Sequence, residues 1–374
     1  MVDDVLVSSD NESYRNFSGC CGNASEELMR KLLIMANDIS ALQLLPVIIY
    51  VGILMVAGAV GNAVVFYVYM YKMKNKSTTK GVFISSLAVL DLLVSCFAMP
   101  FEILDLRNQY CFSSGELCKV MRFLEYSIIL SAGFTLVAVS ADRYLNLCRR
   151  QSRFLFTPSR AKKVCIFCVC LSLCFSWPVI IFAGKRKVSL TIQGYEVEGT
   201  ECTSFGEKEY PGMNAKIYLY TLNVVFIVSL LSMSTLYILI SLKLFRRRKG
   251  TFHKGLLYLD PSSKSSDVKY SKKDVDFEKC GYAIGKRGIR MKGSTVIFYS
   301  VTVVFVLGYL PHLTVRLLKF SGYEYEINGR KLLYNFLVRS FLINSAANPF
   351  IYSLLHQRFR EEVKCTFRRC LGCR

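Results

Sequence analysis

Polar and ionisable side chains stand inside long apolar runs of this sequence. They form five groups: Asn62; Asp91; Asp142-Arg143-Tyr144; Asn344-Ser345; and Asn348-Pro349 with Tyr352. Carboxylate and amide oxygens in such surroundings can hydrogen-bond one another or hold a hard cation, and an Asp-Arg step can form an ion pair. Each group also has an ordinary explanation, because Asp-Arg at a helix end is often a pair that reaches the surface and Asn-Pro is usually a kink. The three histidines lie far apart in the chain and form no paired metal motif, which disfavours an enzyme.

Long uncharged stretches define the elements that must position these groups. No Asp, Glu, Lys or Arg occurs between Asp38 and Lys72, and the stretches 164–184, 217–242 and 293–315 are equally free of charge. A membrane-spanning helix needs about 20 apolar residues, and soluble helices rarely stay uncharged so long. Three more apolar runs carry isolated charges. The sequence therefore predicts an all-α membrane protein with seven spans, near residues 44–71, 82–104, 119–144, 164–184, 217–243, 293–318 and 332–355.

Basic residues set the expected orientation of the spans. The connection 243–292 carries fifteen Lys and Arg against five acids, whereas the segment 1–40 carries seven acids against three bases. By the positive-inside rule, the N-terminus is outside and the C-terminus inside, in a multi-pass protein of the plasma membrane. The net charge of +21 is then a cytoplasmic surface that faces anionic lipid and acidic partners, and not a nucleic-acid-binding surface.

The chain is expected to divide into three regions. Residues 1–40 form an extracellular tail with no signal peptide and with glycosylation sequons at Asn11, Asn16 and Asn23. Residues 41–356 hold the seven spans, with a flexible loop at about 246–290. Residues 357–374 form an amphipathic helix and a tail whose cysteines are candidates for palmitoylation: Cys365, Cys370 and Cys373.

The order of these motifs, each in its own span, resembles the rhodopsin-like G-protein-coupled receptors over roughly residues 40–370. The resemblance implies a disulfide between Cys118 and Cys202, an eighth amphipathic helix anchored by Phe359, and coupling to a heterotrimeric G protein. It assigns coupling and activation to Asp142, Arg143, Tyr144, Tyr237, Asn348, Pro349 and Tyr352. It assigns a conformational switch to Phe305, Tyr309 and Pro311. It also implies a mid-membrane polar network, in which a sodium ion at Asp91 competes with a plain hydrogen-bonded network: Asn62, Asp91, Asn344, Ser345 and Asn348.

Several positions depart from the family pattern. The buried Trp of the fourth span is absent, Ser229 replaces the usual Pro of the fifth, and Tyr309 replaces the usual Trp of the sixth. Ala132 stands where the family usually has a Ser near the sodium ion. These changes leave the expected family unchanged but alter the expected activation geometry.

The nature of the ligand follows from three comparisons within the family pattern. Leu342 stands where an opsin has Lys, and Glu125 stands where an amine receptor has Asp, so retinal is excluded and an amine is disfavoured. A strand–Gly turn–strand pattern over 186–198 predicts a β-hairpin in the second outer loop, which is typical of the peptide receptors. We therefore expect an extracellular neuropeptide or peptide hormone to bind charged residues of the outer bundle: Glu102, Arg122, Glu125, Arg316 and Arg339. Pairing of Arg122 or Arg339 with Glu125 is an equal alternative for these charges.

Two other functions stay open as alternatives. The first is a receptor for a non-peptide small molecule, either an amine or a lipid. The second is a seven-helix transporter, which would need inverted repeats and broken helices that the sequence does not show. In the receptor interpretation, arrestin is a further partner. It would bind the third inner loop, which is the connection 243–292, after phosphorylation of five serines in that loop: Ser262, Ser263, Ser265, Ser266 and Ser271.

Overall fold

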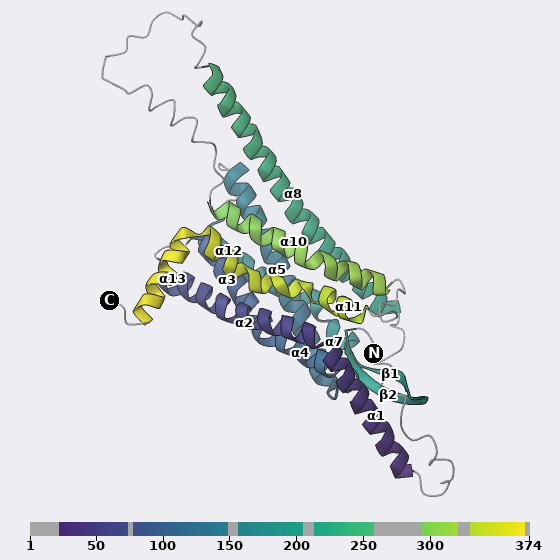
Figure 1. Cartoon of the computed structure of the whole chain (residues 1–374). Helices are drawn as coiled ribbons and strands as arrows, with labels where there is room; N and C mark the ends of the chain where they lie inside the picture. The colour runs from purple at the N-terminus through teal and green to yellow at the C-terminus, as the bar shows by residue number, and fades with distance from the viewer. Residues whose placement is uncertain are drawn as a thin grey trace, which may run out of the picture.

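The computed structural model describes residues 22–73, 78–148, 156–204, 213–257, 293–320 and 330–370. Its helices form an elongated bundle, with a β-hairpin at one end and the C-terminal helix α13 at the other (Figure 1). We call these the hairpin end and the α13 end. Within the described residues, six continuous helices are long and apolar enough to cross a membrane.

The first six spans lie close to their predicted positions. The first is α2, Leu45–Tyr67, which continues as a π-helical turn to Lys72; the second is α3, Thr79–Leu93, joined by a π-helical turn to α4, Met99–Arg107. The third is α5, Gly115–Cys148; the fourth is α6, Pro158–Ser176, followed by the short α7, Val179–Phe182. The fifth is α8, Met213–Leu257, and the sixth is α10, Gly293–Phe320. Because α8 runs to Leu257, it includes the first part of the segment expected to be a flexible loop, while residues 258–292 lie outside the described residues.

The seventh span is divided into two helices. α11, Lys331–Val338, is followed by a 3₁₀ turn, Ser340–Leu342, and by α12, Ile343–Leu355. The Ser340 hydroxyl contacts the carbonyl of Leu337 at 2.8 Å and that of Gly308 in α10 at 2.6 Å, so this break packs directly against the sixth span. α13, Gln357–Cys370, then follows with Phe359 buried against Tyr69 and Tyr352. The predicted seven-helix bundle with an eighth helix is confirmed.

The predicted hairpin is also confirmed. β1, Gly184–Ile192, pairs antiparallel with β2, Tyr195–Thr203, through the two-residue turn Gln193-Gly194. Both turn residues have positive φ, as a tight hairpin turn that matches strand twist requires. The expected disulfide between Cys118 and Cys202 fixes β2 to the start of α5.

α5 lies at the centre of the bundle, where it contacts α3, α6, α8 and α10. Paired hydroxyls join it to α6, which lacks the family's buried Trp. Ser127 meets Ser176 at 2.6 Å, and Ser131 meets Ser172 at 2.5 Å. Small side chains let the two backbones approach closely, and each buried hydroxyl finds a partner across the interface.

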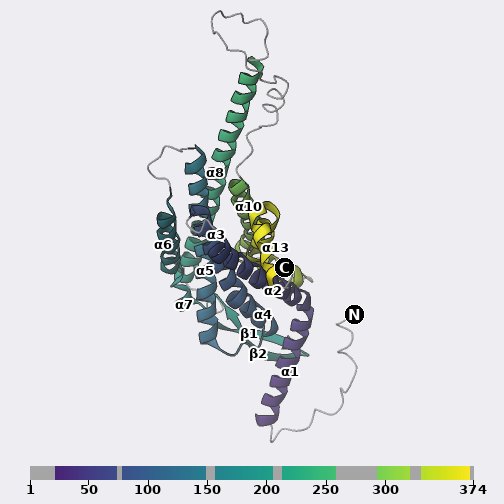
Figure 2. The same cartoon turned by 90° about the vertical axis from the view of Figure 1, so that its left-hand side faces the viewer.

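One helix was not expected from the sequence. α1, Gly22–Gln43, precedes the first span and reaches beyond the bundle beside the hairpin (Figure 2). α1 contacts α4 and β2, and four of its residues are buried: Leu32, Asn37, Ser40 and Ala41.

Candidate functional site

The polar groups expected in the middle of the membrane form two hydrogen-bonded pairs in the structure. Asn348 Nδ2 donates to Asp91 Oδ2 at 2.7 Å, and Asn62 Nδ2 donates to the Ser345 carbonyl at 2.8 Å. All are buried, together with Asn344. The Oδ1 atoms of Asn62, Asn344 and Asn348 have no hydrogen-bond partner among the described residues. Unpaired amide oxygens beside a buried carboxylate can coordinate a hard cation or accept hydrogen bonds from ordered water.

The charged pair at the α13 end of α5 is also formed. Arg143 donates to the adjacent Asp142, which also accepts from Asn146 at 2.9 Å, and the guanidinium lies 5.1 Å from the centre of the Phe298 ring. Tyr237 and Tyr352 are buried, whereas Tyr144 is partly exposed. This arrangement pairs the arginine with the adjacent acid of its own helix at the α13 end of the bundle.

An aromatic cluster joins the fifth, sixth and seventh spans inside the bundle. The rings of Phe305 and Tyr309 lie 4.4 Å apart, and Phe226 of α8 lies 4.7 Å from Tyr309. Tyr309 also packs on Phe341, at the 3₁₀ turn of the seventh span, at 5.6 Å. Tyr309, which stands in place of the family's Trp, therefore contacts both the fifth and the seventh spans close to Pro311.

Five charged residues form a buried network nearer the hairpin end. Arg122 pairs with Glu102 at 2.5 Å, with Glu125 at 2.8 Å and with Asp105 at 2.9 Å. Arg339 pairs with Glu102 at 2.6 Å and with Asp105 at 3.3 Å. Buried charges need partners of opposite sign, and these residues supply them to one another. Of the charges expected to bind a ligand, Glu102, Arg122 and Arg339 are therefore held mainly by internal pairs.

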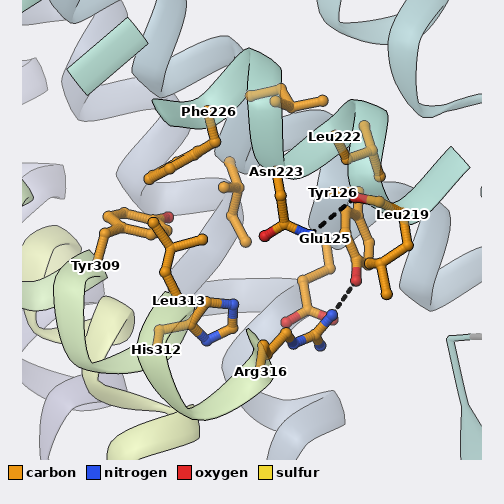
Figure 3. Close-up of a pocket in the computed structure, with 12 residues that line it drawn as sticks. Glu125, Tyr126, Leu219, Leu222, Asn223, Phe226, Tyr309, His312, Leu313 and Arg316 are labelled. Atoms are coloured by element: carbon orange, nitrogen blue, oxygen red, sulfur yellow. Dashed lines mark hydrogen bonds between the residues drawn. The ribbon is translucent and has the colours of Figure 1, made fainter. Parts of the chain in front are cut away.

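A pocket opens beside this network. Glu125, Tyr126 and Arg316 form its polar wall, opposite the apolar side chains of Phe226, Tyr309 and Leu313 (Figure 3). Arg316 donates to the Tyr126 hydroxyl and stacks on that ring, and among the described residues it has no carboxylate within ion-pair distance. The pocket thus presents one acid, one arginine and a wide apolar surface.

Some pocket and network residues were missed from the sequence. Asp105 belongs to the network, and Tyr126, Asn223 and His312 line the pocket. Asp105 lies three residues after Glu102, and that helical spacing was an available signal. His312 donates from Nδ1 to the Val338 carbonyl at 2.5 Å. Val338 ends α11 at the break in the seventh span, and that break was not predicted from the sequence.

The expected modification sites stay predictions. Asn11 and Asn16 lie outside the described residues, and Asn23 lies in α1 with its side chain outside them. Cys365 is exposed on α13, the side chain of Cys370 is outside the described set, and so is all of Cys373.

Comparison with known proteins agrees with this architecture. Residues 61–352 match the model of the "7 transmembrane receptor (rhodopsin family)". The chain is 26% identical to the neuromedin-U receptor 1 of Mus musculus over 336 residues, which covers 88% of this chain and 74% of the relative. It is 26% identical to the thyrotropin-releasing hormone receptor of Mus musculus (91% and 81% covered) and 23% identical to the QRFP-like peptide receptor of Branchiostoma floridae (87% and 77% covered). With the disulfide, the seven spans and the polar motifs in their family positions, the chain belongs to the rhodopsin family of seven-transmembrane receptors.

Proposed function

We propose that the chain is a plasma-membrane receptor for an extracellular neuropeptide or peptide hormone and that it activates a heterotrimeric G protein. The hairpin end faces outward, with the N-terminus, and the α13 end faces the cytoplasm, with most of the basic residues. The relatives that the chain resembles are named for peptides or hormones, which supports the ligand class.

The observation that carries the ligand proposal is the mixed chemistry of the pocket. Glu125 offers a carboxylate, Arg316 offers a guanidinium paired with a neutral phenol, and Leu219 and Leu222 add apolar surface. A peptide end that carries polar groups of both kinds satisfies these side chains. A lipid tail would displace water from these two charged side chains and offer them no polar group beyond their internal partners, which is costly in a buried site.

A screen tests this proposal. Cells that express the chain are exposed to a library of secreted peptides, and calcium and cAMP are recorded against untransfected cells. For a peptide that activates, Glu125→Gln and Arg316→Gln should each raise the EC50 by about tenfold or more, the scale of one hydrogen bond to a charged group. Surface levels should stay normal. Activation by a fatty acid, a sterol or an amine, with no active peptide, would refute the ligand class while leaving the receptor class intact.

The polar network also suits a sodium ion. Asp91 supplies the carboxylate, and the unpartnered oxygens of Asn344 and Asn348 are suitable neighbours, although Ala132 removes one hydroxyl that the family usually offers. A cation here would balance the charge of Asp91 in the unactivated bundle. Sodium titration of agonist binding tests this point, and Asp91→Asn should abolish any sodium effect.

Regulation by arrestin belongs to the same proposal. Support for this part comes from the sequence alone, because the five serines of the third inner loop lie outside the described residues: Ser262, Ser263, Ser265, Ser266 and Ser271. Phosphate groups there would oppose the local positive charge and provide acidic groups for arrestin. Replacing all five with Ala should reduce agonist-driven arrestin recruitment, and unchanged recruitment would refute this part.

A further inference from the structure

α1 is joined to the bundle by buried polar contacts. Asn37 donates to the Arg107 carbonyl at 3.1 Å and accepts from the Tyr110 amide at 3.2 Å, and Ser40 donates to Gln109 at 2.9 Å. Asn37 and Ser40 are only 5% and 3% exposed. Buried polar groups are kept in folded proteins when they are hydrogen-bonded, so these pairs hold α1 in one position.

The segment that receives α1 also carries the hairpin. Tyr110 accepts from the amide of Thr200 in β2 at 2.8 Å, and the Phe112 amide donates back to the Thr200 carbonyl at 2.9 Å. Gly199 lies against Leu33 of α1, and a Cβ at position 199 would meet the Tyr110 carbonyl at 2.8 Å. α1, the turn after α4 and the hairpin therefore form one packed unit at the hairpin end.

Lys331 connects this unit to the seventh span. It is the first residue of α11, and its ammonium group donates to Ser40 Oγ at 2.7 Å and to the Tyr110 hydroxyl at 3.0 Å. The same group lies 5.0 Å from the centre of the Tyr110 ring, within the range of a cation–π contact. One side chain thus joins α1 to the seventh span.

A polar row continues from Lys331 along one side of the seventh span. Asn335 donates to the Lys331 carbonyl at 2.9 Å and accepts from Arg339 at 2.7 Å, so the three residues follow one another at intervals of four. Arg339 then pairs with Glu102, and Glu102 shares Arg122 with Glu125. The contacts form a continuous path from Ser40 in α1 to Glu125 in the wall of the pocket.

We propose that α1 is a positioning element of the ligand pocket and that Lys331 couples it, through Asn335, to Arg339 and the network that ends at Glu125. The inference rests on the proposed function, because it assigns α1 a part in ligand binding. The Lys331 side chain holds the first turn of α11 against α1, and that turn carries the backbone carbonyl to which Asn335 donates. Asn335 in turn accepts from Arg339, so a fixed first turn preorganises Arg339 and the acids beside the pocket. α1 acts here without touching the ligand.

Hydrogen–deuterium exchange of the purified full chain in lipid nanodiscs tests the coupling without any agonist. Ser40→Ala removes one hydroxyl from α1, and exchange should become faster at the amides of residues 331–339, in addition to those near position 40. Lys31→Met is the matched control, because Lys31 also lies in α1 but pairs with Glu27 at an exposed position. This control should leave residues 331–339 unchanged. Faster exchange confined to α1 in the Ser40→Ala chain would overturn the inference.

Agonist potency provides the second readout, with the secreted peptide found active on the unmodified chain as the probe. Lys331→Met removes two hydrogen bonds of a charged group, only part of whose free energy reaches the pocket, so it should raise the EC50 by about tenfold, and Lys331→Arg should restore most of that loss. Ser40→Ala combined with Lys331→Met should raise the EC50 by less than the two single effects together, because both variants remove the contact between Ser40 and Lys331, although Ser40→Ala also removes the bond to Gln109. Fully additive losses would overturn the inference. Coupled exchange in a chain that no peptide activates would refute the proposed ligand class and leave the coupling established.

Discussion

Replacement of Arg122 by Gln should destabilise the bundle rather than weaken ligand binding alone. The Arg122 side chain is 8% exposed and pairs with three carboxylates at 2.5–2.9 Å. Without it, Arg339 still pairs with Glu102 and Asp105, but Glu125 keeps no ion pair among the described residues. Removing one partner of a buried ion pair costs about 3–5 kcal/mol. That is a large share of a total stability of about 5–15 kcal/mol.

The assay for this prediction is thermal unfolding of the purified chain in detergent, together with surface expression in cells. Arg107→Gln is the matched control: it also removes an arginine from an ion pair, with Asp38, but both side chains are about half exposed, at 53% and 50%. An exposed pair contributes about 0–1 kcal/mol, so the control should unfold close to the unmodified temperature. If the Arg122 and Arg107 variants unfold at the same temperature, the network does not stabilise the fold and the reasoning is wrong.

Four further predictions concern other parts of the chain. Gly61→Val should lower surface expression and unfolding temperature, because even a Cβ at position 61 would lie 2.6 Å from Cγ of Pro349; Gly52→Val, with open space around it, should not. Cys118→Ser should lower surface expression and agonist response, and an unaffected chain would show that the disulfide is dispensable. Arg143→Ala should reach the surface and bind agonist but fail in a G-protein activation assay; normal signalling per surface molecule would contradict this. Burial and nearby lysine and arginine side chains lower the pKa of His356 to about 4, below its usual 6.5, so the free energy of unfolding should fall as pH falls from 6.5 to 4. In His356→Gln, the unfolding temperature should depend less on pH over this interval.

The membrane spans and the family motifs were predictable because their signals are local. Uncharged runs such as 39–71 exceed what a soluble helix carries, and the hairpin turn at Gln193-Gly194 stands between two alternating strands. α1 had a weaker signal, a short apolar run that includes Leu32 and Leu33 within a segment that also carries charges. The sequence alone does not show which surface such a run packs against.

The composition and order of residues by themselves determined the number of spans, the expected topology and the family, since each depends on hydrophobicity and spacing along one chain. The i,i+3 spacing of Arg122 and Glu125 already allowed their pair, whereas the tertiary structure alone decided which charges pair between helices. Glu102, Arg122 and Arg339 come from three different spans, and their ion pairs depend on how those helices are rotated and how close they lie. The same is true of Lys331, whose contacts with Ser40 and Tyr110 join segments 291 and 221 residues apart. No local pattern encodes such a junction, because its energy comes from desolvated groups that meet only after the helices have packed.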